Sequence, residues 1–560
     1  MKKYQPRIPL SVLSAFEGKT LLVIGASGFL GKVWLSMFLQ HVHTFKHLYV
    51  IIRPKGKLSA RERFDTMIHQ SFAFAPWFEK KSFSSIQALL NEHITVLDGD
   101  LSVENLGLRK ELAKKIQDQL DIMVNVSGLV DFRAPLESAY KINIRGTCNA
   151  AEFVAQSDHA KLIHVSTCYV AGQTEGAIVE SVSEKTPNHQ TLDLDKEIKW
   201  IEYSTQKLHE KYKSTEKLQE LTDFLRRRNE SKGRNQNIKQ FQRTLEQFTQ
   251  KEKTAEMVTL GADRAQALGF PNTYTYSKAL AELLLKKNYA HIDVSIFRPA
   301  IVESADQYPF PGYNEGFNTS GPLVYLIKGR FRYFPAEEDH PFDVIPVDYV
   351  AKALTLVTAA KLKGKAAPVY QIGTSFLNTF TLGEACQLSS DYYEMYYRQT
   401  GKTFFEKHWR HRKTIATLQD HVFTSKNLLR FFSSLDRHCK AVDELPQRIQ
   451  LWLKPLRGKI FLTKRKLEQA ENLINLFKPF TRDFVQIYIS KNITAFEVKE
   501  KFWTYDIDKL NWEEYWIQRQ MPGLLKWCFP VIEGKSIPNM QQNKKMVLAE
   551  ESLPSIELSA

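Results

Sequence analysis

The chain has 560 residues, enough for two or three domains, and its 43% hydrophobic and 25% charged residues are typical of a globular protein. Its five cysteines lie far apart, without a Cys-x-x-Cys or Cys/His cluster, so the sequence indicates neither a disulfide framework nor a metal site. The formal net charge of +15 favours an anionic partner. Nucleic acid, anionic lipid and a phosphate-bearing substrate are all possible partners of this kind.

The N-terminal segment MKKYQPRIPLSVLSAFEGK has no uninterrupted apolar stretch, so we expect no secretory signal. No window offers ~18 consecutive apolar residues, so no membrane-spanning helix is expected. Together with the cysteine pattern, these features favour a reducing cytoplasm as the location of the protein.

Short apolar runs alternate with helix-like stretches through the first 375 residues. The runs are TLLVI (20–24), HLYVIIR (47–53), ITVLDGD (94–100), DIMVNVSG (121–128), AKLIHVST (160–167) and DVSIFRP (293–299). They are apolar throughout, not at every second residue, which is typical of parallel strands covered on both faces. The pattern predicts an α/β domain with a doubly wound parallel sheet, and we assign residues 1–375 to it.

Three later regions differ from this pattern. Residues 195–262 are rich in Lys, Glu, Gln and Arg, with apolar residues at helical intervals, which predicts a helical insertion broken near Lys232–Gly233. Residues 376–530 are expected to form a mainly helical C-terminal domain. Residues 531–560 are polar and are expected to form a loosely ordered tail.

The stretch GASGFLG lies between the first apolar run and a helix-like stretch. In that context Gly25 permits a tight turn, Gly28 lets the backbone approach a pyrophosphate, and Gly31 allows close packing of helix on strand. A purely structural turn is the alternative, which the flanking pattern disfavours. The expected cofactor contacts here are Gly25, Ser27, Gly28, Phe29, Leu30 and Gly31.

The end of the second apolar run bears on the choice of dinucleotide. An acidic residue there would favour NAD, whereas an arginine accommodates the 2′-phosphate of NADP. The run ends at Arg53, with Lys55 following and no acid, so NADPH is the expected cofactor and NADH the alternative. We expect Asp100, which ends the third run, and Leu101, which follows it, to complete the cofactor contacts.

Ser166 and Thr167 end the fifth apolar run, AKLIHVST. This is the edge of an open α/β sheet at which ligands bind, and hydroxyl groups there can hold a substrate carbonyl. The alternative is that they are ordinary polar residues at the end of a strand.

A Tyr-x-x-x-Lys spacing, which also recurs by chance, marks a candidate proton donor. It occurs at Tyr203…Lys207, Tyr274…Lys278 and Tyr505…Lys509. Only Tyr274 begins a helix-like stretch with a strand-end Ser/Thr pair upstream. On a helix Tyr274 and Lys278 share a face, and we expect Lys278 to lower the pKa of Tyr274 from its usual value of about 10, which would make Tyr274 a usable proton donor.

Together these motifs resemble the extended short-chain dehydrogenase/reductase family, and more narrowly its alcohol-forming fatty acyl-CoA reductase branch. The narrow resemblance rests on VDFRAPLESAYKINIRGT (130–147), PNTYTYSKALAE (271–282), FRPAIVESADQYPFPGYNEGFNTSGP (297–322) and NWEEYWIQRQMPGLLKW (511–527). It covers about residues 10–375 strongly and 376–530 more loosely. The sequence departs from the family pattern at NVSG (125–128) and in its large, charged insertion.

The resemblance implies an extended Rossmann fold and an enzyme of lipid metabolism that reduces long-chain fatty acyl-CoA with NADPH, through an aldehyde, to a fatty alcohol. It implies that Thr167, supported by Ser166, holds the carbonyl oxygen, that Tyr274 donates the proton, and that Lys278 also holds the nicotinamide ribose.

Other functions stay open at this point. A thioester reductase that releases fatty aldehyde, from acyl-CoA or from an acyl-carrier protein, would share every motif. A sterol or sugar-nucleotide reductase or epimerase is disfavoured by the segment 297–322 and the C-terminal region. A non-catalytic dinucleotide sensor could dispense with Thr167, Tyr274 and Lys278, and a nucleic-acid-binding protein has no supporting motif.

Residues 402–466 are strongly basic, with 16 Lys or Arg against 5 Asp or Glu. Aromatic and aliphatic residues are interleaved with these charges, which is compatible with peripheral contact with an anionic membrane or with the phosphates of CoA. The alternative is a helical domain whose basic faces are merely solvated.

Overall fold

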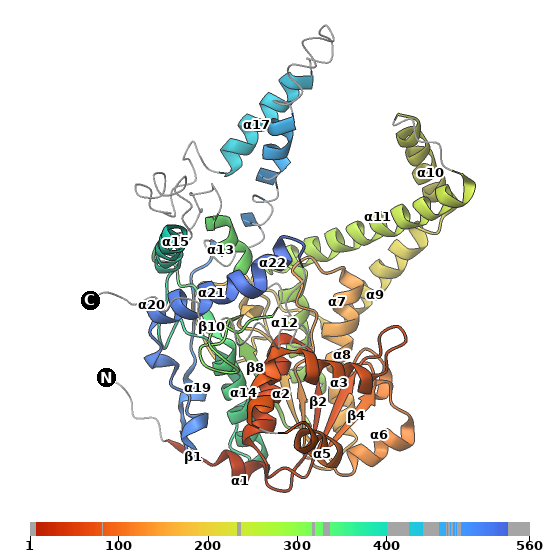
Figure 1. Ribbon diagram of the computed structural model, residues 1–560. Coiled ribbons are helices and arrows are strands. Elements are labelled where there is room, and N and C mark those ends of the chain that lie inside the picture. The colour runs from red at the N-terminus through yellow and green to blue at the C-terminus, as the bar shows by residue number, and fades with distance from the viewer. Residues whose placement is uncertain are drawn as a thin grey trace.

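The computed structural model describes residues 7–80, 82–231, 237–315, 320–328, 337–399, 425–440, 458–465 and 483–535, with isolated positions between 467 and 478. Most of the basic stretch 402–466 and of the polar tail 531–560 therefore lies outside the described residues. Figure 1 shows a compact body that carries the sheet, with helices that project from it. No helix within the described residues is long and apolar enough to cross a membrane.

A seven-stranded sheet forms the centre of the body, in the order β11-β8-β6-β5-β2-β3-β4. Its strands are β2 (Thr20–Ile24), β3 (His47–Ile52), β4 (Ile94–Asp98), β5 (Ile122–Asn125), β6 (Lys161–Val165), β8 (Val294–Pro299) and β11 (Val369–Ile372). Every pairing is parallel, so the six expected strands and the doubly wound α/β fold are confirmed. The four-residue strand β11 adds a seventh at the edge, beside β8.

Helices cover both faces of the sheet (Figure 1). One face carries α1 (Val12–Phe16), α2 (Phe29–His41) and α14 (Val347–Leu362), with α3 (Ala60–Gln70), α4 (Ala75–Lys80) and α5 (Phe83–His93) beside them. The other face carries α6 (Lys110–Gln117), α8 (Gly146–Ala155) and α12 (Thr273–Asn288). Successive side chains of a strand point to opposite faces, so Val23 of β2 enters one core and Leu22 the other. This explains why the runs are apolar throughout.

The insertion forms an arm of three helices that projects from the body (Figure 1). They are α9 (Leu194–Lys211), α10 (Thr215–Glu230) and α11 (Ile238–Ala267). The break expected near Lys232–Gly233 falls between α10 and α11, at residues outside the described ones. At its base the arm packs on α12 and on α7 (Leu136–Ala139).

The C-terminal segment returns to the sheet-bearing body. Its described elements include α15 (Leu382–Gln399), α17 (Ser425–Lys440), β12 (Gln486–Tyr488), β13 (Phe496–Val498), α20 (Trp512–Tyr515), α21 (Met521–Gly523) and α22 (Phe529–Ile532). Strand β12 pairs with β7 (Gly176–Ile178) and β13 with β1 (Ile8–Leu10). Trp503 and Trp527 are buried in the same core as α2. The segment after 483 thus shares a core with the first domain, and the division at 375 stays a prediction.

Candidate active site

The turn between β2 and α2 has a backbone that requires glycine. Gly25 has φ +92°, and a Cβ there would lie 2.5 Å from the Ser127 nitrogen. A Cβ on Gly31 would lie 2.9 Å from the Ala26 Cα, which keeps α2 close to the turn. At Gly28 a Cβ would meet only the Gly25 carbonyl oxygen, at 3.5 Å, so this backbone is open to the approach of a ligand.

The N-terminus of α2 is suited to an anion. Gly28 caps the helix without a side-chain hydrogen bond, and the first turn contains no acidic residue. The free N–H groups and the helix dipole therefore favour a phosphate at this point. Ser27 is exposed, while Phe29 and Leu30 are half-buried, with the Phe29 ring 6.0 Å from that of Tyr313. The residues present thus fit the pyrophosphate of a dinucleotide.

Helix α12 places Tyr274 and Lys278 at the carboxyl edge of the sheet, beside the end of β6. The Asn272 side chain caps this helix by accepting a hydrogen bond from the Thr275 N–H at 3.0 Å. Tyr274 and Lys278 are both buried, and the Tyr274 hydroxyl lies near the side chain of Thr167, which follows β6 and partly offsets the rise in the pKa of the phenol that burial causes. The structure therefore brings together three of the four residues that the sequence assigns to catalysis.

Ser166 is the fourth of these residues. Its backbone N–H donates to the Phe297 carbonyl at 2.7 Å, which fixes the end of β6 beside β8. Its Oγ atom is buried and has no hydrogen-bond partner in the described part of the chain. A buried hydroxyl without a partner is costly, so Ser166 Oγ is a candidate contact for a bound substrate oxygen.

Lys278 reaches across the ends of two strands. Its Nζ donates a hydrogen bond to the Val165 carbonyl at 2.9 Å. The same atom lies close to Gly128, just after β5, because a Cβ added at residue 128 would be 2.8 Å from the Lys278 Nζ. Burial lowers the pKa of Lys278 to about 8, and the nearby Glu282 carboxylate opposes the shift. The side chain is therefore still mostly charged at neutral pH.

The expected effect of Lys278 on Tyr274 is wrong for this structure. Burial raises the pKa of Tyr274 to about 12, and the hydrogen bond that opposes this shift comes from Thr167. The Lys278 ammonium instead donates to the Val165 carbonyl. In this arrangement the phenol stays protonated at neutral pH, which is the form that can donate a proton.

Asn143 is a residue of this site that the sequence did not single out. It lies in a π-helical turn (Tyr140–Arg145), and its Oδ1 accepts from the Leu129 N–H at 2.8 Å. Its Nδ2 donates to the Ser277 Oγ at 2.9 Å, next to Lys278 on α12. Asn143 thus ties the loop after β5 to the helix of Tyr274. It lies in the quoted stretch 130–147, but no spacing rule marks it.

Arg53, Asp100 and Leu101 lie at the ends of β3 and β4. The Arg53 side chain is 65% exposed, and its Nη1 lies 3.8 Å from Asp100 Oδ2. Arg63 of α3 donates to the Arg53 carbonyl, which places a second guanidinium at this edge. Leu101 is buried, and its carbonyl accepts from Asn149 Nδ2 at 2.8 Å. Arg53 is therefore exposed enough to face a ligand, whereas the Leu101 side chain belongs to the core.

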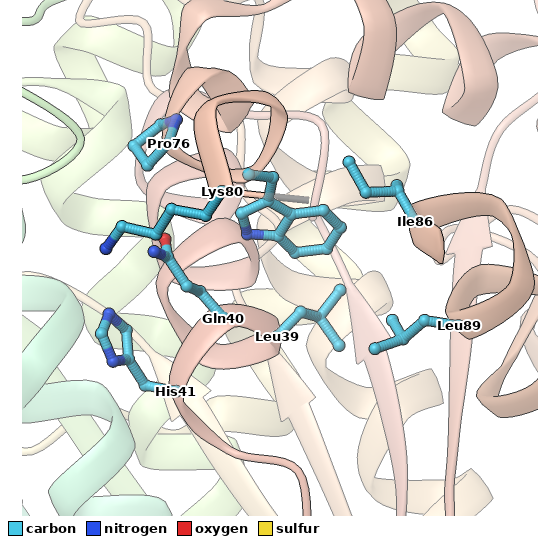
Figure 2. A pocket seen from close by; sticks show the side chains of 8 residues that line it. Leu39, Gln40, His41, Pro76, Lys80, Ile86 and Leu89 are labelled. Carbon is cyan, nitrogen blue, oxygen red and sulfur yellow. The ribbon is translucent and has the colours of Figure 1, made fainter. Parts of the chain in front are cut away.

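A cavity at the far end of α2 is separate from this site. It has a volume of about 180 Å³ and lies between α2, α4 and α5, with Leu39, His41, Lys80, Ile86 and Leu89 in its walls (Figure 2). The glycine turn lies at the opposite end of the same helix. Sites for small molecules usually measure about 300–1,000 Å³, so this cavity is smaller than such a site.

Comparisons with known proteins identify a family for the chain. Residues 23–354 match the NAD-binding family model described as male sterility protein. The probable fatty acyl-CoA reductase 4 of Arabidopsis thaliana is 27% identical over 528 residues, which cover 91% of this chain and 97% of that protein. The alcohol-forming fatty acyl-CoA reductase of Simmondsia chinensis is 25% identical over 535 residues, which cover 92% and 98%.

Among solved structures, the reductase domain of a non-ribosomal peptide synthetase from Mycobacterium tuberculosis is similar with a TM-score of 0.45 and 16% sequence identity. The similarity covers 87% of this chain and 86% of that one.

Proposed function

Since the chain belongs to the male sterility protein family, whose model matches more than half of it, we propose that it reduces long-chain fatty acyl-CoA with NADPH to a fatty alcohol through an aldehyde. The relatives that match almost the whole chain are fatty acyl-CoA reductases, which makes an oxidoreductase the general class. The observation that carries the proposal is the proximity of Thr167 to Tyr274, beside Lys278 and the Ser166 hydroxyl, which has no hydrogen-bond partner in the described part of the chain.

Each of these side chains has a separate role in the proposed reaction. When bound, NADPH supplies hydride to the carbonyl carbon of the substrate. Thr167 and Ser166 hold the carbonyl oxygen as negative charge develops on it. Tyr274 gives its phenolic proton to that oxygen. Lys278, which is mostly charged at neutral pH, holds the nicotinamide ribose.

The stoichiometry follows from the chemistry of a thioester. One hydride and one proton convert the thioester to a thiohemiacetal, which breaks its C–S bond to release CoA as the thiol and leaves an aldehyde. A second hydride and a second proton convert the aldehyde to the primary alcohol. Two NADPH are therefore oxidised for each CoA released.

NADPH is proposed over NADH because of the cations at the end of β3. Arg53 is exposed, Arg63 binds its carbonyl, and Lys55 follows in an exposed turn. A guanidinium recognises phosphate through two parallel hydrogen bonds, which suits the 2′-phosphate of NADPH. Asp100 is the one carboxylate paired with Arg53 among the described residues, and it would compete with that phosphate.

We also propose peripheral contact with an anionic membrane, with the cytoplasm as the location. Phe431 on α17 and Phe461 and Leu462 on the helical stretch 458–465 are more than half exposed. Arg430 and Lys459 are exposed beside them. Apolar side chains flanked by cations suit an anionic lipid surface. Co-sedimentation with anionic but not neutral vesicles tests this point.

The decisive experiment follows NADPH oxidation by the purified protein with palmitoyl-CoA and measures CoA release and organic-phase products. Two NADPH per CoA and a fatty alcohol would establish the proposed reaction. One NADPH per CoA and a fatty aldehyde would identify the aldehyde-forming thioester reductase. Absence of oxidation with palmitoyl-CoA and with a palmitoyl-carrier protein would overturn the assignment.

A further inference from the structure

The base of the projecting arm is bound to the helix that carries Tyr274. Glu197 of α9 accepts from the Arg264 Nε of α11 at 2.8 Å and from a second nitrogen of the same guanidinium. Glu197 also accepts a hydrogen bond from the Tyr276 hydroxyl of α12. One carboxylate thus joins both long helices of the arm to the helix of the active site.

Tyr276 and Tyr274 face opposite sides of α12. An α-helix turns by 100° per residue, so side chains two positions apart point about 200° apart. Tyr274 contacts Thr167 on the sheet side, while Tyr276 contacts Glu197 on the arm side. The first turns of α12 are therefore held between the sheet and the arm.

The contact of Glu197 with Tyr276 and Arg264 is buried, which restricts the geometry that these side chains can adopt. The Glu197 side chain is only 2% exposed, and Tyr276 is 1% exposed. A buried carboxylate requires its partners, and removal of one partner leaves an uncompensated charge in the protein. Arg264 is further fixed by stacking over the Trp200 ring, 4.7 Å from its centroid. The triad formed by Glu197, Arg264 and Tyr276 can therefore adopt few alternative arrangements.

A close backbone approach adds a second contact between the arm and α12. Gly261 of α11 lies against Thr273, the first residue of α12, because a Cβ at 261 would be 2.7 Å from Thr273 Oγ1. A Cβ there would also lie 3.3 Å from the Leu136 Cβ. The contacts of the arm with Tyr276 and with Thr273 therefore both act on the first turn of α12, which carries Tyr274.

Further along, α12 has less support on this side. A cavity of about 450 Å³ is lined by Ala279 and Leu283 of α12 and by Pro187 and Phe270 opposite them. Glu282, which also lines the cavity, is paired with Arg298 of β8. Because a cavity borders the middle of the helix on this side, the contacts with the arm support its N-terminal half there.

We propose that Glu197 and Arg264, acting through Tyr276, are positioning residues that hold Tyr274 and Lys278 in register with Thr167. The inserted arm is then a support for the active site and not an independent appendage. This inference rests on the proposed function for its kinetic consequence, whereas the effect on α12 can be measured without any substrate.

The arm contains a chemically matched control triad. On the same arm, Glu256 accepts from the Tyr212 hydroxyl at 2.9 Å and pairs with Lys211. It thus joins a tyrosine, a carboxylate and a cation, and within the described residues it has no hydrogen bond or ion pair to α12. Glu197→Gln and Tyr276→Phe test the proposal, and Glu256→Gln and Tyr212→Phe control for a general loosening of the arm. Tyr276→Phe removes one hydroxyl and leaves the Glu197–Arg264 pair, so it should still fold.

Two measurements separate positioning from folding. Hydrogen exchange of the full chain, read in peptides that cover 273–288, should increase in Glu197→Gln and Tyr276→Phe and stay unchanged in the two controls. With palmitoyl-CoA, kcat should fall by about 10- to 100-fold in Glu197→Gln, since small misplacements of reacting groups cost that much. The dissociation constant for NADPH and the KM for the acyl substrate should each change by less than about twofold.

The outcomes are distinct. If Glu197→Gln and Glu256→Gln raise the exchange of α12 equally, or if neither does, the positioning role is wrong. Raised exchange in α12 with unchanged kcat also overturns it. If the wild-type protein reduces no acyl thioester, the proposed function fails, but the exchange experiment still decides whether the arm holds α12.

Discussion

A Cβ at residue 128 would lie 2.8 Å from the Lys278 Nζ and 3.2 Å from its Cε, so Lys278 occupies the space that any side chain at 128 would need. Gly128 ends the stretch NVSG, just after β5. The absence of a side chain at this position leaves room for Lys278. The loop itself is held by Asn143, which bonds both the N–H and the carbonyl of Leu129.

Gly128→Ala should therefore displace Lys278. Since Lys278 is buried and bonded to the Val165 carbonyl, its Nζ cannot move aside without loss of that bond. We expect turnover to fall by about 100-fold, in line with the cost of misplaced groups, and NADPH binding to weaken. Fluorescence titration with NADPH and steady-state kinetics measure both effects. Gly458→Ala is the control, because a Cβ at 458 would meet no atom of the described residues within 4 Å.

Tyr274→Phe should abolish turnover while NADPH still binds. Loss of a general acid costs about 10²- to 10⁴-fold in kcat. Tyr203→Phe is a matched control, because Tyr203 has the same spacing to a lysine but is 66% exposed on the arm. Equal activity of the two variants would show that the hydroxyl of Tyr274 takes no part in the reaction.

The charge of Lys278 should set the alkaline limit of activity. Burial lowers the pKa of this amine to about 8, so it loses its proton as the pH rises through 8, below the usual range of lysine. If the cation is needed, kcat/KM for NADPH falls above pH 8. Lys278→Arg keeps a charge throughout and should shift this fall to higher pH, although its larger head group will lower the plateau. A profile from pH 6 to 10 that is the same for both proteins would contradict this role.

Most of the sheet could be predicted because parallel strands buried on both faces are apolar at every position. The run DIMVNVSG is an example, with Met123 and Val124 both buried but on opposite faces. Strand β11 was not predicted, since four residues provide too short a pattern. The pairing of β13 with β1, across almost the whole chain, has no local signal because it depends on tertiary packing.

The part of the site that lies in recognisable sequence motifs could be predicted. Thr167 and Tyr274 were both identified, and they meet because one ends a strand and the other begins a helix on the same edge. The pKa of Tyr274 was predicted in the wrong direction, because the depth of burial cannot be deduced from a spacing of four residues. Asn143 was missed for a similar reason, since its role comes from a π-helical turn and contacts distant in sequence.

The preference for NADPH should depend on Arg53. Arg53→Gln should raise the KM for NADPH by about tenfold, the equivalent of one charge-assisted hydrogen bond, and leave the KM for NADH unchanged. Asp100→Asn should have the opposite effect and lower the KM for NADPH slightly, because it removes the carboxylate 3.8 Å from the guanidinium. Their pairing is partly exposed, so the gain should be small. If Arg53→Gln affects both cofactors equally, the 2′-phosphate lies elsewhere.

Glu303 should make the stability of the protein depend on pH. It ends β9 (Ile301–Glu303) and is fully buried; its Oε2 accepts from Gln520 Nε2 at 2.6 Å, and its Oε1 has no partner in the described part of the chain. Burial raises the pKa of Glu303 to about 7. A raised pKa means that the folded protein holds the proton more tightly than the unfolded chain, so the stabilisation is complete below about pH 4.5 and is lost as the pH rises through 7.

Glu303→Gln should remove this dependence, since an amide keeps a hydrogen-bonding group at the same place and never ionises. The variant should unfold at a higher temperature than the wild type at pH 8, where ionisation of Glu303 costs up to roughly 3 kcal/mol by linkage. At pH 5 the two proteins should differ little. Thermal unfolding at both pH values measures the effect, and Glu513→Gln, at an exposed position on α20, is the control. A variant that is less stable than the wild type at pH 8 would mean that the Glu303 carboxylate has a cation or other partner that stabilises its charge.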